Sequence, residues 1–389
     1  MLAFTAKTLM TPTETVQHPL VLVADGKIVE IATRAARPGP DGVQVLDLAD
    51  GLLAPGYVDL HIHGGGGSDV MDADVHALPT IERLIARHGV TGYFPTTVTA
   101  PLDATLRALE RLADGIENRS QDNRSDDRRA CPLGIHLEGP FISHIRKGVH
   151  PAADLLPPKL ETFDRFWQAA RGHVRMMTIA PELEGAAEVI AEATRRGVCV
   201  SLGHSDADFA AAKRGLEAGA RHATHTFNAM RPLDHRAPGI LGAVLTDSRL
   251  SADLIADGIH LDPAIVRLVA NAKGAQQTVL ITDATAATGM PDGRYHLGLL
   301  EVEVKDGRCM AEGKLAGSVL TMDKAVRNLA RFADWSLPQA VAAATQNPAR
   351  IARIANKGVL AAGADADFVV LNSAGEVLRT FVGGVECSS

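Results

Sequence analysis

Eight short apolar runs recur along the middle of the chain, and each of them ends in polar or glycine-rich residues. The runs are nearly continuous in hydrophobicity, which is typical of strands buried on both faces of a parallel sheet. We therefore predict eight strands in this region. They span residues 56–63, 91–97, 133–139, 175–182, 199–205, 222–228, 252–258 and 278–284.

Segments with helical periodicity separate most of these runs, and three of the clearest four meet a glycine at or just past their ends. Eight strands alternating with helices predict a (β/α)₈ barrel. An open doubly wound sheet is disfavoured because no glycine-rich phosphate loop of the G-x-G-x-x-G type follows the first run, and because of where the polar residues fall. We expect residues 230–245 to be mostly loop and further helices from residue 338 to about 355. The four clear helical segments are 80–89, 102–118, 186–197 and 208–220.

The two ends of the chain have a different pattern. Residues 21–32 alternate around Asp25-Gly26, which predicts a β-hairpin. Two apolar runs flank a turn again within residues 363–384. We therefore predict one small β domain, built from residues 1–54 plus 359–389, beside a barrel domain of residues 55–358.

The overall charge gives no reason to expect a nucleic-acid partner, because the net charge is −7. No run reaches the roughly 18 consecutive apolar residues of a membrane helix. The start of the chain lacks a basic segment followed by a continuous apolar one, so we predict no secretory signal and no membrane association. Residues 118–130 are polar and of mixed charge, and we expect them to form a solvated surface loop.

The four cysteines are scattered, and no two of them form a C-x-x-C pair. This spacing argues against a zinc ribbon and against a disulfide framework. It favours free thiols in a reducing compartment, so we predict a cytoplasmic protein.

Histidines and carboxylates stand where the predicted strands end, which is where barrel enzymes build their active sites. One histidine in a strand is usually structural, but five such groups on four strands, with an aspartate on a fifth, predict a metal site. Imidazole and carboxylate suit zinc, iron and other first-row divalent ions. The groups are His61 and His63 on the first strand, Glu138 on the third, His204 on the fifth, His225 on the sixth and Asp283 on the eighth.

Five motifs carry a family resemblance. The segment P-G-Y-V-D-L-H-I-H-G at 55–64 resembles the amidohydrolase superfamily. Four others narrow the resemblance to its N-acetylglucosamine-6-phosphate deacetylase family. This resemblance covers nearly the whole chain and implies a barrel with a small β-sandwich formed by both ends. The four are H-L-E-G-P-F at 136–141, S-L-G-H-S at 201–205, H-x-F-N-A-M at 225–230 and T-D-A-T at 282–285.

The resemblance also implies roles for the strand-end residues. Glu138, His204 and His225 would hold the metal common to the family. His61 and His63 would complete a second position bridged by Glu138, so one or two zinc or iron ions are expected per chain. Asp283 would be the general acid/base. The residues alone also allow Asp283 to be a metal ligand or a helix cap.

Other positions match the family's substrate contacts, and the resemblance implies a homodimer acting on an amino-sugar phosphate. Arg236 and His260 would bind the phosphate, and in family members one of these groups can reach the partner's site. On the residues alone, Arg236 is equally well a surface arginine. We expect His136 and His222 to be structural. The remaining contacts would be Val149 and His150 near the acetyl group, Asn228 and Ala229 on the sugar, and the loop Leu315, Ala316, Gly317 and Ser318 beside the acetyl group.

Three alternatives remain at this point. A deacetylase of N-acetylgalactosamine 6-phosphate would use the same residues and differ only in how it recognises the sugar's 4-hydroxyl. A dihydroorotase or D-aminoacylase would lack the pair of Arg236 and His260. A scaffold without activity would have lost Asp283 or a metal ligand, and none of these is lost.

Overall fold

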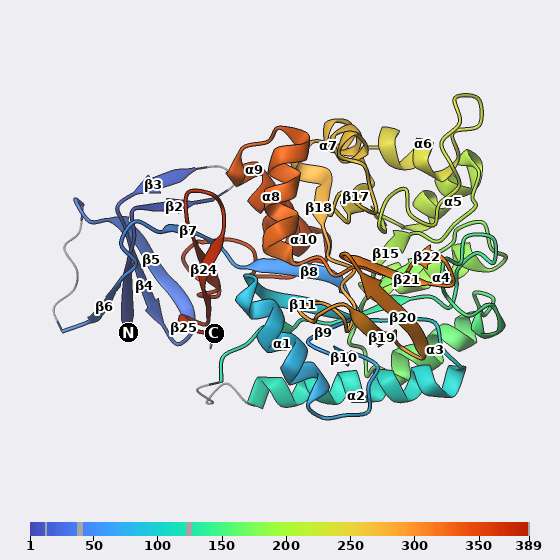
Figure 1. Cartoon of the computed structure of the whole chain (residues 1–389), viewed down its shortest axis with the longest axis horizontal. Coiled ribbons are helices and arrows are strands. Elements are labelled where there is room, and N and C mark those ends of the chain that lie inside the picture. Colours follow the sequence, from blue (N-terminus) through green and yellow to red (C-terminus); the bar gives the residue numbers. More distant parts are fainter. Residues whose placement is uncertain (12–13, 37–41, 122–126, 388–389) are drawn as a thin grey trace.

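A computed structural model describes residues 1–11, 14–36, 42–121 and 127–387. The strands from the two ends of the chain lie together on one side, and the helices and strands of the middle form a larger body beside them (Figure 1). No helix in these described ranges combines the length and the apolar character needed to span a membrane.

The larger body is the predicted (β/α)₈ barrel. Its neighbouring strands pair in parallel, and a parallel bridge between Ile62 and Ala284 joins the last strand region to the first. The strands are β8 (Tyr57–Ile62), β11 (Val90–Thr97), β13 (Ile135–Glu138), β14 (Val174–Ile179), β15 (Cys199–Leu202), β16 (His222–Ala223), β17 (Ser251–Leu254) and β18 (Thr278–Leu280). A short strand, β12 (Cys131–Pro132), also pairs with β11.

All eight predicted strands are present, but several end earlier than the apolar runs suggest. The run 222–228 contributes only two residues to β16. The chain leaves the sheet at this point because His225, Phe227 and Ala229 adopt positive φ angles of 28°, 81° and 49°. A strand cannot continue through such angles, so the polar end of the run becomes a turn.

Ten helices lie in the described part of the chain, and the four clearest predicted segments correspond to α1, α2, α4 and α5. The helices are α1 (Ala77–Arg87), α2 (Leu102–Gln121), α3 (Leu160–Ala169), α4 (Ala186–Arg195), α5 (Phe209–Ala218), α6 (Gly239–Thr246), α7 (Pro263–Gln277), α8 (Met322–Ala333), α9 (Leu337–Ala343) and α10 (Gln346–Ile351). A short 3₁₀ turn spans Ala152–Asp154.

The expectation that residues 230–245 are mostly loop was wrong for their second half, because α6 begins at Gly239. Its sequence, GILGAVLT, is apolar on nearly every side, and six of its eight residues are buried. A helix buried all round has no polar face, so it shows no amphipathic period.

Strands from both ends of the chain share one sheet, in which β7 pairs with β23 and β2. A second sheet faces it, and Phe4 packs edge-on against Phe368 and Phe381 at ring distances of 4.9 and 5.4 Å. The six-stranded sheet holds β2 (Thr8–Met10), β3 (Thr15–Gln17), β7 (Leu52–Pro55), β23 (Phe368–Leu371), β24 (Val377–Val382) and β25 (Val385–Glu386); the four-stranded sheet holds β1 (Leu2–Thr5), β4 (Pro19–Ala24), β5 (Lys27–Thr33) and β6 (Gln44–Asp47).

Both predicted turns of this region are present. Ala24 pairs with Lys27, so Asp25-Gly26 forms a two-residue hairpin loop with both φ angles positive. The strands β23 and β24 pair antiparallel across the second turn. The domain limits at 54/55 and 358/359 stay a prediction.

Two smaller sheets lie on the barrel. One is an antiparallel insertion between β18 and α8, with its own apolar core that includes Leu297, Val302 and Cys309. It consists of β19 (Gly293–Leu297), β20 (Leu300–Lys305), β21 (Arg308–Ala311) and β22 (Lys314–Leu315). The other pairs β9 (Gly64–Gly65) with β10 (Ser68–Asp69) directly after β8.

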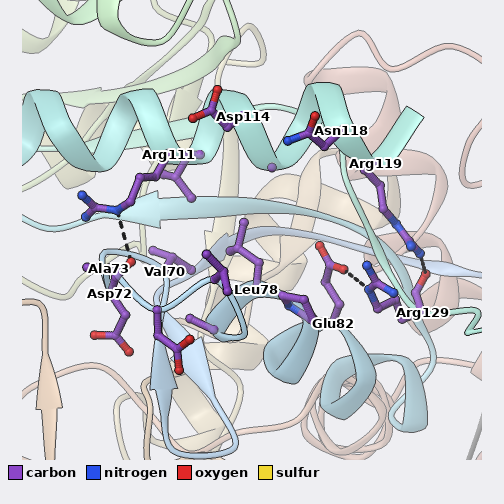
Figure 2. A pocket seen from close by; sticks show the side chains of 16 residues that line it. Val70, Asp72, Ala73, Leu78, Glu82, Arg111, Asp114, Asn118, Arg119 and Arg129 are labelled. Carbon is purple, nitrogen blue, oxygen red and sulfur yellow. Dashed lines mark hydrogen bonds and ion pairs between the residues drawn. The ribbon is translucent and has the colours of Figure 1, made fainter. Parts of the chain in front are cut away.

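The expectation of a solvated loop at 118–130 needs correction. Residues 122–126 lie outside the described part, and α2 extends to Gln121. Arg129 is only 9% exposed, and its Nε donates to Glu82 Oε2 at 2.6 Å. Figure 2 shows this pair at the edge of a cavity of about 290 Å³ between α1 and α2. An arginine can be buried here because a buried carboxylate pairs with it.

We predict that Arg129→Met destabilises the protein by about 3–5 kcal/mol, the cost of leaving a buried charge unpaired. The measurement is the urea midpoint of unfolding. Arg83→Met is the matched control. Arg83 pairs with Asp127, and this pair is more exposed than that of Arg129 with Glu82, with 43% and 33% of the two side chains accessible, so the variant should lose at most about 1 kcal/mol. Equal stability of the two variants would contradict the prediction.

Candidate active site

A cavity of about 230 Å³ opens among the residues that follow the barrel strands. Most residues predicted for the site line it, together with Gly148 and Leu297, which the sequence did not suggest. The predicted residues that line it are His63, Glu138, Val149, His150, His204, His225, Asn228, Ala229, His260, Asp283, Leu315 and Gly317.

Four predicted residues do not line the cavity. His61 is fully buried, and its Nε2 lies 3.1 Å from His63 Nε2. Ser318 supports Asp283 from behind, because its backbone N–H donates to the Asp283 carbonyl at 2.7 Å. Ala316 is buried in the core of the inserted sheet. Arg236 is exposed on the loop before α6 and is not among the residues that line the cavity.

Glu138 lies between two pairs of histidines. Its Oε1 is 3.2 Å from His204 Nε2 and 3.0 Å from His225 Nε2. Its Oε2 is 3.2 Å from His63 Nε2, and His61 Nε2 lies 3.4 Å from Oε1. Each pair, together with Glu138, brings its ligand atoms within 4.8 Å of one another and could hold a metal ion.

The hydrogen bonds behind two of the four rings, those of His63 and His204, favour a bound cation. His63 Nδ1 donates to the Thr96 carbonyl and His204 Nδ1 to the Arg146 carbonyl, each at 2.9 Å. A neutral ring that carries its proton on Nδ1 presents a lone pair at Nε2. In each pair the two Nε2 atoms are only 3.0–3.1 Å apart, close enough for both to bind one cation.

Electrostatics favour the same conclusion. Burial opposes ionisation of Glu138, but the neighbouring imidazoles of His61, His150, His204 and His225 outweigh it and hold the Glu138 pKa well below its usual value. Burial lowers the pKa of His204 to about 4, so this ring is neutral and able to act as a ligand. Although burial also acts on His225, its hydrogen bond to Glu138 raises its pKa to about 9. The carboxylate therefore stabilises positive charge beside it.

Asp283 lies on the other side of His63, with its Oδ1 3.2 Å from His63 Nε2 and 3.5 Å from His61 Nε2. Burial raises its pKa, but His61 and His63 outweigh burial and bring the pKa to about 2. Asp283 is therefore an ionised carboxylate in the cavity wall, which is the form that a general base requires.

Backbone turns aim three of these side chains into the cavity. His204, His225 and Asp283 have φ angles of 46°, 28° and 50°, in the left-handed region that costs non-glycine residues of order 1–3 kcal/mol. Hydrogen bonds hold these turns in place. The His225 N–H donates to the buried Asp253 carboxylate, and the Asp283 N–H donates to the His61 carbonyl.

The sequence did not identify the buried acids that support the site. Asp253 accepts from His222 Nε2 at 2.9 Å as well as from the His225 backbone. Asp257 accepts from His260 Nδ1 at 2.7 Å and orients that ring. Both acids lie in the apolar run 252–258. A carboxylate within an apolar strand is seldom buried without a partner, so these two aspartates could have been identified from the sequence. His222 serves Asp253, and His136 bonds Leu60 and Thr178 deeper in the barrel.

A parallel barrel that carries two histidine–carboxylate groups at the carboxyl ends of its strands has the architecture of a metal-dependent hydrolase. The comparisons agree with this class. The chain belongs to the amidohydrolase family, whose sequence model matches residues 52–387.

Individual relatives cover most of the chain. It is 37% identical to the N-acetylglucosamine-6-phosphate deacetylase of Lysinibacillus sphaericus, over 90% of this chain and 89% of the relative. It is also 37% identical to the N-acetylgalactosamine-6-phosphate deacetylase of Escherichia coli O157:H7, over 93% of each chain.

A solved structure shares the same fold over almost its whole length. It is a variant of the Mycobacterium smegmatis N-acetyl-D-glucosamine-6-phosphate deacetylase in complex with N-acetyl-D-glucosamine-6-phosphate. The identity is 35% and the TM-score is 0.92, with 100% of this chain and 99% of that chain covered.

We predict that the two histidine pairs can be separated by metal analysis of zinc-loaded protein. Changing both His61 and His63 to alanine should lower the content from about two ions per chain to about one, if a two-metal site is present. His204→Ala should remove the ion of the other pair and leave the His61/His63 ion in place. Unchanged zinc in the double variant would mean that His61 and His63 serve only the fold.

Proposed function

We propose that this protein hydrolyses the acetamide of N-acetyl-D-glucosamine 6-phosphate and releases acetate and D-glucosamine 6-phosphate. The observation that carries the proposal is the placement of Asp283, an ionised carboxylate, beside the two histidine pairs that share Glu138. The names of the relatives supply the substrate class.

In this proposal Glu138, His204 and His225 would hold one divalent ion, zinc or iron, and His61, His63 and Glu138 would hold a second. When bound, such an ion supplies a Lewis acid that polarises a carbonyl and makes water more acidic. The remaining steps belong to side chains of this chain. Asp283 accepts a proton from the attacking water and later delivers it to the amide nitrogen, because an amine leaves readily only once protonated.

In this proposal, different residues of the cavity wall contact different parts of the substrate. His150 donates a hydrogen bond to the acetyl oxygen. Asn228 and Ala229 contact the sugar, and the Nδ2 atom of Asn228 has no acceptor within the described ranges, so it is available to a hydroxyl. Val149, Leu315 and Gly317 line the cavity and surround the acetyl group. Ala316 and Ser318 support this loop from behind.

The phosphate is assigned to His260 and Arg236. The described residues that line the cavity include no arginine or lysine, so His260 needs a further cation to balance a phosphate. The exposed Arg236 supplies it, from its own chain or across a homodimer. We also propose that the protein works in the cytoplasm, in keeping with its four free cysteines.

N-acetylgalactosamine 6-phosphate is the second candidate substrate, because one relative carries that activity in its name. An acetate-release assay with both phosphorylated sugars, and with N-acetylglucosamine lacking the phosphate, separates the candidates. The proposal expects the highest kcat/KM for N-acetylglucosamine 6-phosphate. A higher kcat/KM for N-acetylgalactosamine 6-phosphate would identify that sugar as the substrate instead. Absence of acetate release from all three sugars would refute deacetylation.

Replacing Asp283 by asparagine keeps its size and removes the base. We predict that kcat falls by roughly 10²–10⁴-fold, the range for loss of general acid–base catalysis. Metal content and substrate binding should survive, because Glu138, His204 and His225 do not depend on Asp283. Metal analysis and equilibrium binding provide the control. If the variant loses its metal, Asp283 is mainly a metal ligand. If it keeps wild-type turnover, another group transfers the proton.

For the phosphate we predict that Arg236→Ala lowers kcat/KM for the phosphorylated sugar by roughly tenfold to a hundredfold, since one charge-assisted hydrogen bond contributes about 1.5–3 kcal/mol. Activity on unphosphorylated N-acetylglucosamine should hardly change. Arg165→Ala, at an exposed position of α3, is the matched control. An equal loss for both sugars would assign Arg236 a structural role.

A further inference from the structure

The histidines of the cavity have two kinds of neighbour behind their rings. Behind His63 and His204, the group facing Nδ1 is a backbone carbonyl, which can only accept a hydrogen bond. Those rings therefore carry hydrogen on Nδ1, and in the neutral form each turns a lone pair toward the carboxylate. This is the state in which a histidine binds a metal.

His150 has the opposite kind of neighbour. Its Nδ1 lies 3.4 Å from the backbone N–H of Thr99 and 2.8 Å from the Thr99 hydroxyl. A backbone N–H can only donate, and the hydroxyl can rotate to donate as well. Nδ1 must therefore be the acceptor, and the hydrogen of the neutral ring is on Nε2. This Nε2 lies 3.6 Å from Glu138 Oε2.

The surroundings leave Thr99 and His150 little freedom. The two side chains are 4% and 3% exposed. Gly139, directly after Glu138, packs against both. A Cβ atom at position 139 would lie 2.2 Å from Thr99 Oγ1 and 3.5 Å from His150 Nδ1. The backbone of Gly139 also has a φ of +76°, which glycine adopts freely. A side chain there would displace the Thr99 hydroxyl from the ring.

We infer that Thr99 is a positioning residue that keeps His150 in the Nε2–H tautomer. This keeps His150 out of the metal-ligand set, although its ring centre is only 4.7 Å from that of His204. It also makes His150 a hydrogen-bond donor to the amide carbonyl, where negative charge develops during hydrolysis. The second role rests on the proposed function, whereas the tautomer is a property of the protein alone.

The test compares zinc-loaded wild type with Thr99→Val, which removes the hydroxyl at nearly constant volume, and Thr99→Ser, which keeps it. Two-bond ¹H–¹⁵N correlation spectra of ¹⁵N-histidine protein report which ring nitrogen of His150 is protonated. The signal is assigned by its absence in His150→Gln. We expect the Nε2–H form in wild type and Thr99→Ser, and a loss or mixture of forms in Thr99→Val.

The kinetic readout should follow the spectra. Thr99→Val should lower kcat about tenfold with KM nearly unchanged, a smaller loss than removal of a whole oxyanion donor, and Thr99→Ser should restore most of it. An Nδ1–H ring in wild type overturns the inference without any variant, and so does a Thr99→Val protein with unchanged tautomer and turnover. If no sugar is deacetylated but the tautomers behave as expected, the proposed function fails and the positioning role stands.

Discussion

An ionised carboxylate that is only 3% exposed must be compensated locally, because an uncompensated buried charge costs several kcal/mol. Glu138 meets this requirement with histidine nitrogens on both of its oxygens. The same arrangement brings pairs of ring nitrogens within 3.0–3.1 Å of each other, where both can bind one cation. The geometry of the cavity follows from this constraint, since β13 carries the carboxylate and the ends of β8, β15 and β16 each deliver one or two of the histidines that surround it.

Buried polar groups behind the cavity hold that arrangement. Asp59 on β8 accepts from the Thr282 hydroxyl at 2.6 Å and so joins the first strand of the barrel to the end of the last. Asp253 performs the corresponding task for the His225 turn. These acids have no exposed surface, and their hydrogen bonds offset both their burial and the left-handed backbone that the turns require.

The groups behind the rings also divide the histidines by function. Carbonyls behind His63 and His204 leave lone pairs in the cavity, whereas Thr99 behind His150 leaves a hydrogen. Histidines in the same cavity can therefore serve either as metal ligands or as a hydrogen-bond donor. The inserted sheet β19–β22 closes another side of the cavity with Leu297 and Leu315.

The sequence by itself determined the eight strands, the Asp25-Gly26 hairpin and the six strand-end groups, because strand burial, turn conformation and barrel geometry are local or periodic properties. Tertiary structure decided the rest. α6 has no amphipathic period because it is buried all round. Arg129 is buried because Glu82, 47 residues away in sequence, accepts its hydrogen bond. The tautomer of His150 depends on Thr99, 51 residues away. Neither partner has a local signature, since a hydrogen bond between distant segments exists only once the barrel has brought them together.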